Sequence, residues 1–163
     1  MPAQILALLE NFENAAEVSA SLKLAGHQLL VVNNYRRAMA ILSDRNFDLI
    51  ISDVHLQSGN VFDFLRWVKA NPTIRETQFV LFSSHPTERA KLIAESVQMA
   101  AHLLGASSYI VMESFDPLLF CQEIELLLNQ EAGSKVTKAK TRKLSNKNPL
   151  ERAAQERRPR TAP

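Results

Sequence analysis

Apolar and polar residues follow a pattern along residues 1–130 that changes period repeatedly. Short runs of branched apolar residues predict buried strands, and between them apolar residues recur every three or four positions, as in amphipathic helices. The predicted strands are residues 4–9, 29–32, 48–52, 79–82 and 109–112. The predicted helices are residues 14–25, 35–43, 61–70, 87–104 and 117–129.

Strands and helices that alternate with short connections predict an α/β fold. Consecutive strands joined through helices lie parallel, and right-handed crossovers place the helices on both faces of the sheet. We therefore expect a doubly wound five-stranded parallel sheet. Gly26 and Gly105 follow two of the predicted helices and are expected to end them, and Asn71-Pro72 ends a third, because a residue before proline disfavours helical geometry.

Charge divides the chain of 163 residues into two parts. Residues 1–130 carry 9 of the 19 Lys and Arg and 14 of the 17 Asp and Glu, whereas residues 131–163 carry the other 10 and 3. The first part, at −5, is long enough to bury one core. The second part, at +7, has too few apolar residues to order itself. We predict one domain at 1–130 and a disordered basic tail at 131–163.

The basic tail has no aromatic residues that would stack on bases. It is therefore expected to be a flexible polycation without sequence preference. Three roles stay open: a solvated linker, weak binding to nucleic acid or another polyanion, and contact with the acidic domain.

Several other classes of protein find little support in the sequence. No uninterrupted apolar stretch is long enough to span a bilayer, and no basic segment precedes the first apolar run, so we expect no membrane association and a cytoplasmic location. The four histidines and the single Cys121 are scattered, which argues against zinc. With only 4 glycines and no glycine-rich phosphate loop, nucleotide binding is not expected, and we do not expect an enzyme.

Asp53 is the first candidate for chemistry. It follows the apolar run at 48–52 and precedes a polar loop, so the predicted parallel strand delivers one carboxylate to the carboxyl edge of the sheet. Ligands bind at that edge in folds of this kind.

Five strand–helix units with Asp53 after the third strand resemble the receiver domain of two-component response regulators, a flavodoxin-like fold. The resemblance covers about residues 4–130. Its matching stretches are residues 5–10, 26–29, 48–59, 80–84 and 105–109.

The resemblance implies a role for several side chains. Asp53 matches the phosphoacceptor, and Ser83 and Tyr109 match the residues that respond to the phosphoryl group. Glu10, Asp53 and the backbone carbonyl of His55 match the ligands of a divalent ion, which implies a weak Mg²⁺ site. The implied partners are a histidine kinase or another signalling protein.

Two positions depart from the receiver pattern. Leu9 stands where the family has the first of two acids, and Met112, or Glu113 in an alternative register, stands where it has a lysine. Phosphoryl transfer depends on charge stabilisation, so these losses predict a degenerate receiver that works with phosphorylation impaired. A weakened but working phosphoacceptor at Asp53, and a different doubly wound protein, are the alternatives.

The helix predicted at 87–104 carries two apolar stripes. One runs through Ile93, Val97, Ala100 and Leu104, and the other through Leu92, Met99 and Leu103. One stripe suffices to cover a sheet. The second either widens the core face or, with Tyr109, forms a surface for a partner or a second copy. The resemblance favours the latter, because receivers commonly bind through their fourth helix, fifth strand and fifth helix.

Overall fold

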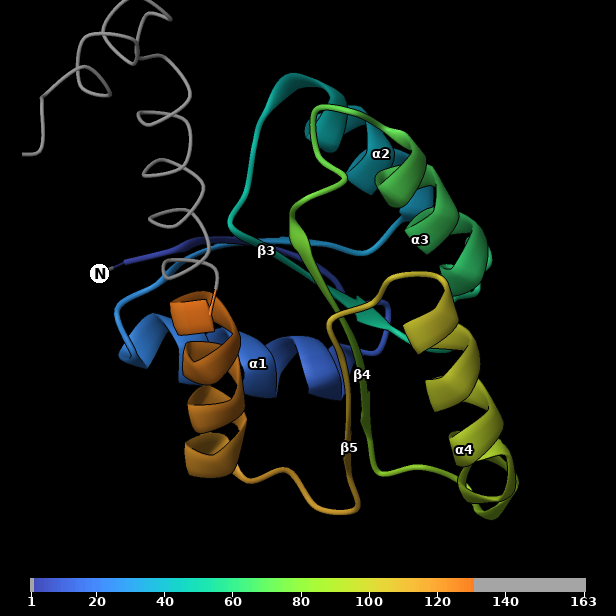
Figure 1. Ribbon diagram of the computed structural model, residues 1–163. Coiled ribbons are helices and arrows are strands. Elements are labelled where there is room, and N and C mark those ends of the chain that lie inside the picture. Colours follow the sequence, from blue (N-terminus) through green and yellow to red (C-terminus); the bar gives the residue numbers. More distant parts are fainter. Residues whose placement is uncertain (1, 131–163) are drawn as a thin grey trace, which may run out of the picture. The chain divides into compact units, whose positions relative to one another are not determined.

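The computed structural model describes residues 2–130, which form a single five-stranded parallel sheet with helices on both faces (Figure 1). The strand order is β2-β1-β3-β4-β5, so β2 lies on one side of β1, and β3, β4 and β5 lie on the other. This is the order of a doubly wound sheet, and it confirms the predicted fold. The strands are β1 (Gln4–Leu8), β2 (Gln28–Val32), β3 (Leu49–Asp53), β4 (Gln78–Ser84) and β5 (Ser108–Met112).

Helices divide between the two faces of the sheet (Figure 1). The helices are α1 (Phe12–Leu24), α2 (Tyr35–Asp44), α3 (Val61–Ala70), α4 (Glu88–Leu103) and a last helix at 117–130. Helices α2, α3 and α4 pack with one apolar cluster, which includes Phe64 and Phe79. Helix α1 and the last helix pack with a second cluster, which includes Phe82 and Phe120. Each fully buried side chain of this size contributes about 1.5–3 kcal/mol relative to exposure.

Capping residues set the ends of α1. The helix begins at Phe12, two residues earlier than predicted, because the side chain of Asn11 accepts a hydrogen bond from the backbone N–H of Asn14 at 3.0 Å. It ends before Gly26, whose φ of +89° is readily adopted only by glycine.

The strands that carry the candidate site extend further than predicted. Asp53 is the last residue of β3 and pairs with Phe82, so it lies in the sheet and not after it. Strand β4 continues through Ser83 and Ser84, because these pair with Val111 and Met112 of β5. The polar ends of β3 and β4 therefore meet at one edge of the sheet.

A buried histidine joins the last helix to the start of the sheet. His27 Nδ1 accepts a hydrogen bond from the backbone N–H of Ala3 at 3.1 Å, and Nε2 lies 2.7 Å from a carboxylate oxygen of Glu125. A neutral ring with its proton on Nε2 satisfies both contacts.

The compact unit that contains the sheet ends at Leu128. The predicted tail at 131–163 lies outside the described residues. In the part of the chain that is described, no helix has both the length and the apolar character that a bilayer crossing demands.

Candidate functional site

Asp53 lies at the carboxyl edge of the sheet beside a cavity of about 170 Å³. The residue is only 4% exposed. The cavity is lined by residues from β3, β4 and the loops that follow them, together with the start of α1: Asn11, Asn14, Val54, His55, Ser83, Ser84, His85 and Thr87 are among them. The sequence placed Asp53, His55 and Ser83 at one edge, and the structure brings all three to this cavity.

Three N–H groups hold the Asp53 carboxylate. The backbone N–H groups of Glu10 and Asn11 donate to Oδ2 at 2.7 and 3.0 Å, and the Asn14 side chain donates to Oδ1 at 2.9 Å. These donors come from the β1–α1 loop and the first turn of α1. The carboxylate thus occupies the positive end of that helix.

The pKa of Asp53 is raised above its ordinary value of 3.8. Burial is the largest cause, since removal from water disfavours the charged form. Hydrogen bonds from Asn11, Asn14 and Glu10 lower the pKa, and the nearby Glu10 charge raises it. The donors around Asp53 therefore compensate its desolvation only in part.

The Glu10 side chain binds the loop between β3 and α3. Its carboxylate accepts hydrogen bonds from the backbone N–H groups of Gln57 and Ser58, the latter at 3.1 Å, and from the Ser58 hydroxyl. Ser58 Oγ in turn accepts a hydrogen bond from the backbone N–H of Tyr35, at the start of α2, at 2.9 Å. Glu10 therefore connects three loops of the sheet edge.

The arrangement of these carboxylates does not fit Mg²⁺. That ion requires near-octahedral oxygen ligands, whereas Asp53 and Glu10 each face a set of N–H or O–H donors. Among residues 2–130, no group of three or more His, Cys, Asp or Glu side chains is placed to hold a metal ion.

The two positions that depart from the receiver pattern carry no cation to the site. Leu9 is 1% exposed and packs in the apolar cluster beneath α1, and Met112 is 7% exposed in the same cluster. Glu113 forms an ion pair with Lys91 of α4 at 3.1 Å. Within the described residues, the ion pairs do not include Asp53.

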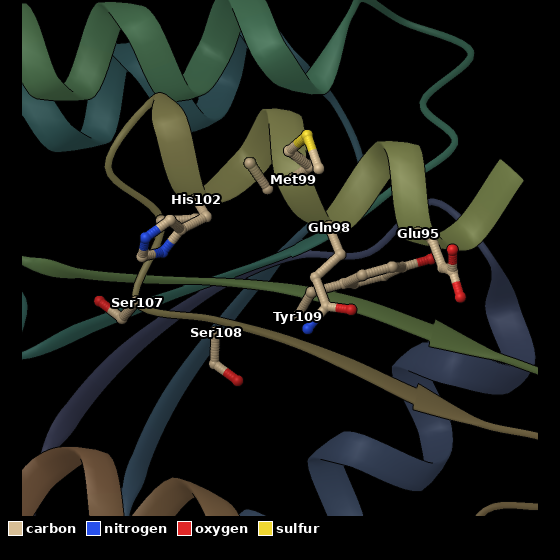
Figure 2. Close-up of a pocket in the computed structure, with 9 residues that line it drawn as sticks. Glu95, Gln98, Met99, His102, Ser107, Ser108 and Tyr109 are labelled. Atoms are coloured by element: carbon tan, nitrogen blue, oxygen red, sulfur yellow. The ribbon is translucent and has the colours of Figure 1, made fainter.

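Ser83 and Tyr109 belong to two different cavities. Ser83 lines the Asp53 cavity, whereas Tyr109 lines a larger one, about 440 Å³, between α4 and β5. Figure 2 shows the Tyr109 ring beneath α4, extending toward Glu95, with Gln98 and Met99 on the helix above it. Burial raises the pKa of the Tyr109 hydroxyl.

Leu92, Met99 and Leu103 make up what we call the outer face of α4. They are 86%, 67% and 77% exposed. The helix packs on the sheet through a narrower stripe, in which Ala101 is buried and Val97 and Leu104 are partly buried. The assignment of Ile93 to the covering stripe was wrong: it is 43% exposed, because the stripe that faces the sheet runs through Ala94, Val97, Ala101 and Leu104.

Asn11 and Asn14 are site residues that sequence reasoning missed. Asn11 lies in the loop after the first strand, and Asn14 follows three residues later, which is a typical spacing for a helix cap. That signal was present, but it predicts a helix start and not a donor to Asp53.

Comparison with curated proteins finds similarity to a two-component response regulator. The two-component response regulator ORR3 of Oryza sativa, in both subspecies indica and japonica, is 29% identical over 97 residues, which cover 58% of this chain and 74% of that protein. No family model matches the sequence.

Solved structures share the fold at lower identity. Chemotaxis response regulator CheY4 of Vibrio cholerae is 23% identical with a TM-score of 0.66, over 78% of this chain and 99% of that one. The receiver domain of sensor histidine kinase PA1611 from Pseudomonas aeruginosa, solved with a magnesium ion in its active-site cleft, is 15% identical with a TM-score of 0.65, over 79% and 99%.

Proposed function

We propose that this chain, which is similar in sequence to a two-component response regulator and shares the fold of CheY-like receivers, acts in a two-component pathway by binding other proteins, with phosphorylation of Asp53 impaired. The single observation that carries this proposal is the environment of Asp53, in which N–H donors bind the carboxylate and no ion pair with a basic side chain of residues 2–130 is formed.

Two physical requirements of phosphoryl transfer are poorly met there. An aspartate that attacks phosphorus needs an accessible oxygen, whereas Asp53 is buried and bonded to Glu10, Asn11 and Asn14. The transferred group also needs positive charge on its oxygens. Met112 supplies none, and the carboxylates of Glu10 and Asp53 are not arranged around an ion.

The direct test is the mass of the protein after incubation with a small phosphodonor and magnesium chloride. We expect no added phosphoryl mass, and a phosphorylation-competent receiver treated in parallel is the positive control. Stoichiometric, magnesium-dependent labelling of the native chain that is lost in Asp53→Asn would establish the alternative, a working phosphoacceptor.

The outer face of α4 is the proposed site of protein contact. Leu92, Met99 and Leu103 expose apolar surface next to the cavity that contains Tyr109. Exposed apolar patches of this kind are typical of interaction sites. A second copy of the chain or another signalling protein, such as a histidine kinase, would bury this face without disturbing the Asp53 cavity.

Self-association measured by sedimentation over a range of concentrations tests the second-copy version of this proposal. We expect Met99→Glu to weaken association, because it places a charge in the apolar contact. Leu24→Glu is the matched control, since Leu24 is 92% exposed at the end of α1. A native chain that stays monomeric throughout would exclude the homodimer.

A further inference from the structure

We propose that Asp53 and Glu10 are structural anchors of a metal-independent lock. The lock joins the β1–α1 loop, the β3–α3 loop and the start of α2 through hydrogen bonds of the chain's own groups. It gives both carboxylates a role that needs neither a metal ion nor a phosphoryl group. This inference concerns what the two acids do for the fold, and it does not depend on whether Asp53 is ever phosphorylated.

The first half of the lock fixes the start of α1 to the end of β3. Asp53 accepts three bonds, from the backbone of Glu10 and Asn11 and from the Asn14 side chain, at 2.7 to 3.0 Å. Asn11 caps α1 through Asn14, so the bonded groups belong to one helix terminus. An anion at this position satisfies N–H groups that the helix itself leaves without acceptors.

The second half of the lock starts from the Glu10 side chain. Its carboxylate binds the backbone of residues 57 and 58 and the Ser58 hydroxyl, and Ser58 Oγ accepts the Tyr35 N–H at 2.9 Å. Contact between the same two segments is close: a Cβ at Gly59 would lie 3.0 Å from the Tyr35 ring. The β3–α3 loop is thus held from both β1 and α2.

The chemistry of the donors distinguishes an anchor from a metal ligand. The groups that Asp53 and Glu10 face are N–H and O–H donors, which carry partial positive charge and repel a cation. Binding Mg²⁺ at these oxygens would require some of those bonds to break, and around the buried Asp53 a donor left without an acceptor is costly. Hydrogen bonds therefore already occupy carboxylate oxygens that Mg²⁺ would need.

Amide hydrogen exchange of the full chain tests the lock residue by residue. In Glu10→Ala we expect the amides of Gln57 and Ser58 to exchange faster by about fivefold or more, as the loss of a bond worth about 1 kcal/mol implies. In Ser58→Ala the Tyr35 amide should accelerate in the same way. Asp44→Ala is the matched control, because Asp44 is an exposed acid at the end of α2.

Magnesium titration of the native chain, followed by melting temperature, completes the test. We expect no change at millimolar magnesium chloride. The lock would be overturned by unchanged exchange at residues 57 and 58 in Glu10→Ala, or by a magnesium-dependent rise in melting temperature that Glu10→Ala abolishes. Phosphorylation of Asp53 alongside accelerated exchange in Glu10→Ala would instead reject the proposed function and leave the lock in place.

Discussion

Burial of the Asp53 carboxylate makes stability depend on pH in an unusual direction for an acid. The pKa of Asp53 in the folded protein lies above its ordinary value of 3.8, and the unfolded chain ionises near that value. Between the two pKa values the folded state holds a proton that the unfolded state has lost. The free energy of unfolding from this group therefore falls as pH rises through the window, and is constant above it.

We expect the difference in unfolding free energy between the native chain and Asp53→Asn to be largest near the acidic end of a urea-denaturation series and to decline as pH rises. The series should run from about pH 4 to about pH 7, upward from the ordinary aspartate pKa. A difference that grows with pH would show that hydrogen bonds to the carboxylate outweigh its desolvation.

Leu9 stands where the receiver pattern has an acid. Its side chain is buried in the apolar cluster under α1, so Leu9→Asp places a carboxylate in that core. We expect a loss of about 3 kcal/mol or more in unfolding free energy. Leu24→Asp, at an exposed position, should cost little. A stable Leu9→Asp protein would show that the position still opens toward the Asp53 cavity.

The sequence was sufficient to place residues at the edge of the sheet but not to orient their side chains. Asp53 and Ser83 meet because β3 and β4 are neighbours in the parallel sheet. Periodicity predicted Asp53 at the end of its strand, whereas Ser83 was identified through the resemblance to receivers. The direction of the Glu10 side chain depends on which groups bind its carboxylate oxygens more strongly, a metal ion or the N–H groups of the β3–α3 loop. Gln57 and Ser58 are 47 and 48 residues distant along the chain, so no local pattern reveals that competition.

Among the helices, α4 is covered least by the rest of the domain. Its contact with the sheet centres on Ala101, while Leu92, Met99 and Leu103 point away from the core. Alanine allows a helix to approach a sheet closely, and the short side chain leaves no space for a larger one. The same helix therefore has one side that tolerates substitution and another that does not.

Paired substitutions on α4 measure this difference. We expect Ala101→Leu to lower the unfolding free energy by about 1–3 kcal/mol through overpacking. Met99→Glu should change it by less than about 0.5 kcal/mol, as at other exposed positions. Urea denaturation followed by circular dichroism gives both values. If Met99→Glu proves the more damaging, the outer face of α4 is part of the core.

The periodicity of apolar residues was sufficient to predict which segments are helices and which are strands. The ends of these elements depend on single polar side chains. Helix α3 spans Val61–Ala70 as predicted, because Asn60 caps its start and Asn71-Pro72 ends it. Strand β4 outran its prediction because its polar end residues are paired with β5, and pairing between distant strands leaves no mark on local hydrophobicity.

At the scale of the whole molecule, charge separates along the chain, with −5 in residues 1–130 and +7 in residues 131–163. We predict that a chain ending at Gln130 keeps the melting temperature of the full chain, because the last helix is anchored through His27 and Glu125. The full chain should bind DNA weakly, without base preference and with a steep loss on added salt, since lysine and arginine contact phosphates.

Melting curves and DNA binding at two salt concentrations, measured on both chain lengths, decide this prediction. Equal binding by the two would remove residues 131–163 from the interaction. A markedly lower melting temperature of the shorter chain would show that those residues contribute to the stability of the domain.

The lock between Asp53, Glu10 and Ser58 also has a consequence for control in the cell. A domain whose loops are set by a reversibly bound ion gains stability by mass action, in proportion to the logarithm of the ion concentration when the ion is in excess. The stability that a lock gains from internal hydrogen bonds does not depend on the concentration of any ligand. Under the proposed lock and the proposed function, we expect occupancy of a partner to follow the amounts of the two proteins, so that synthesis and degradation regulate the complex.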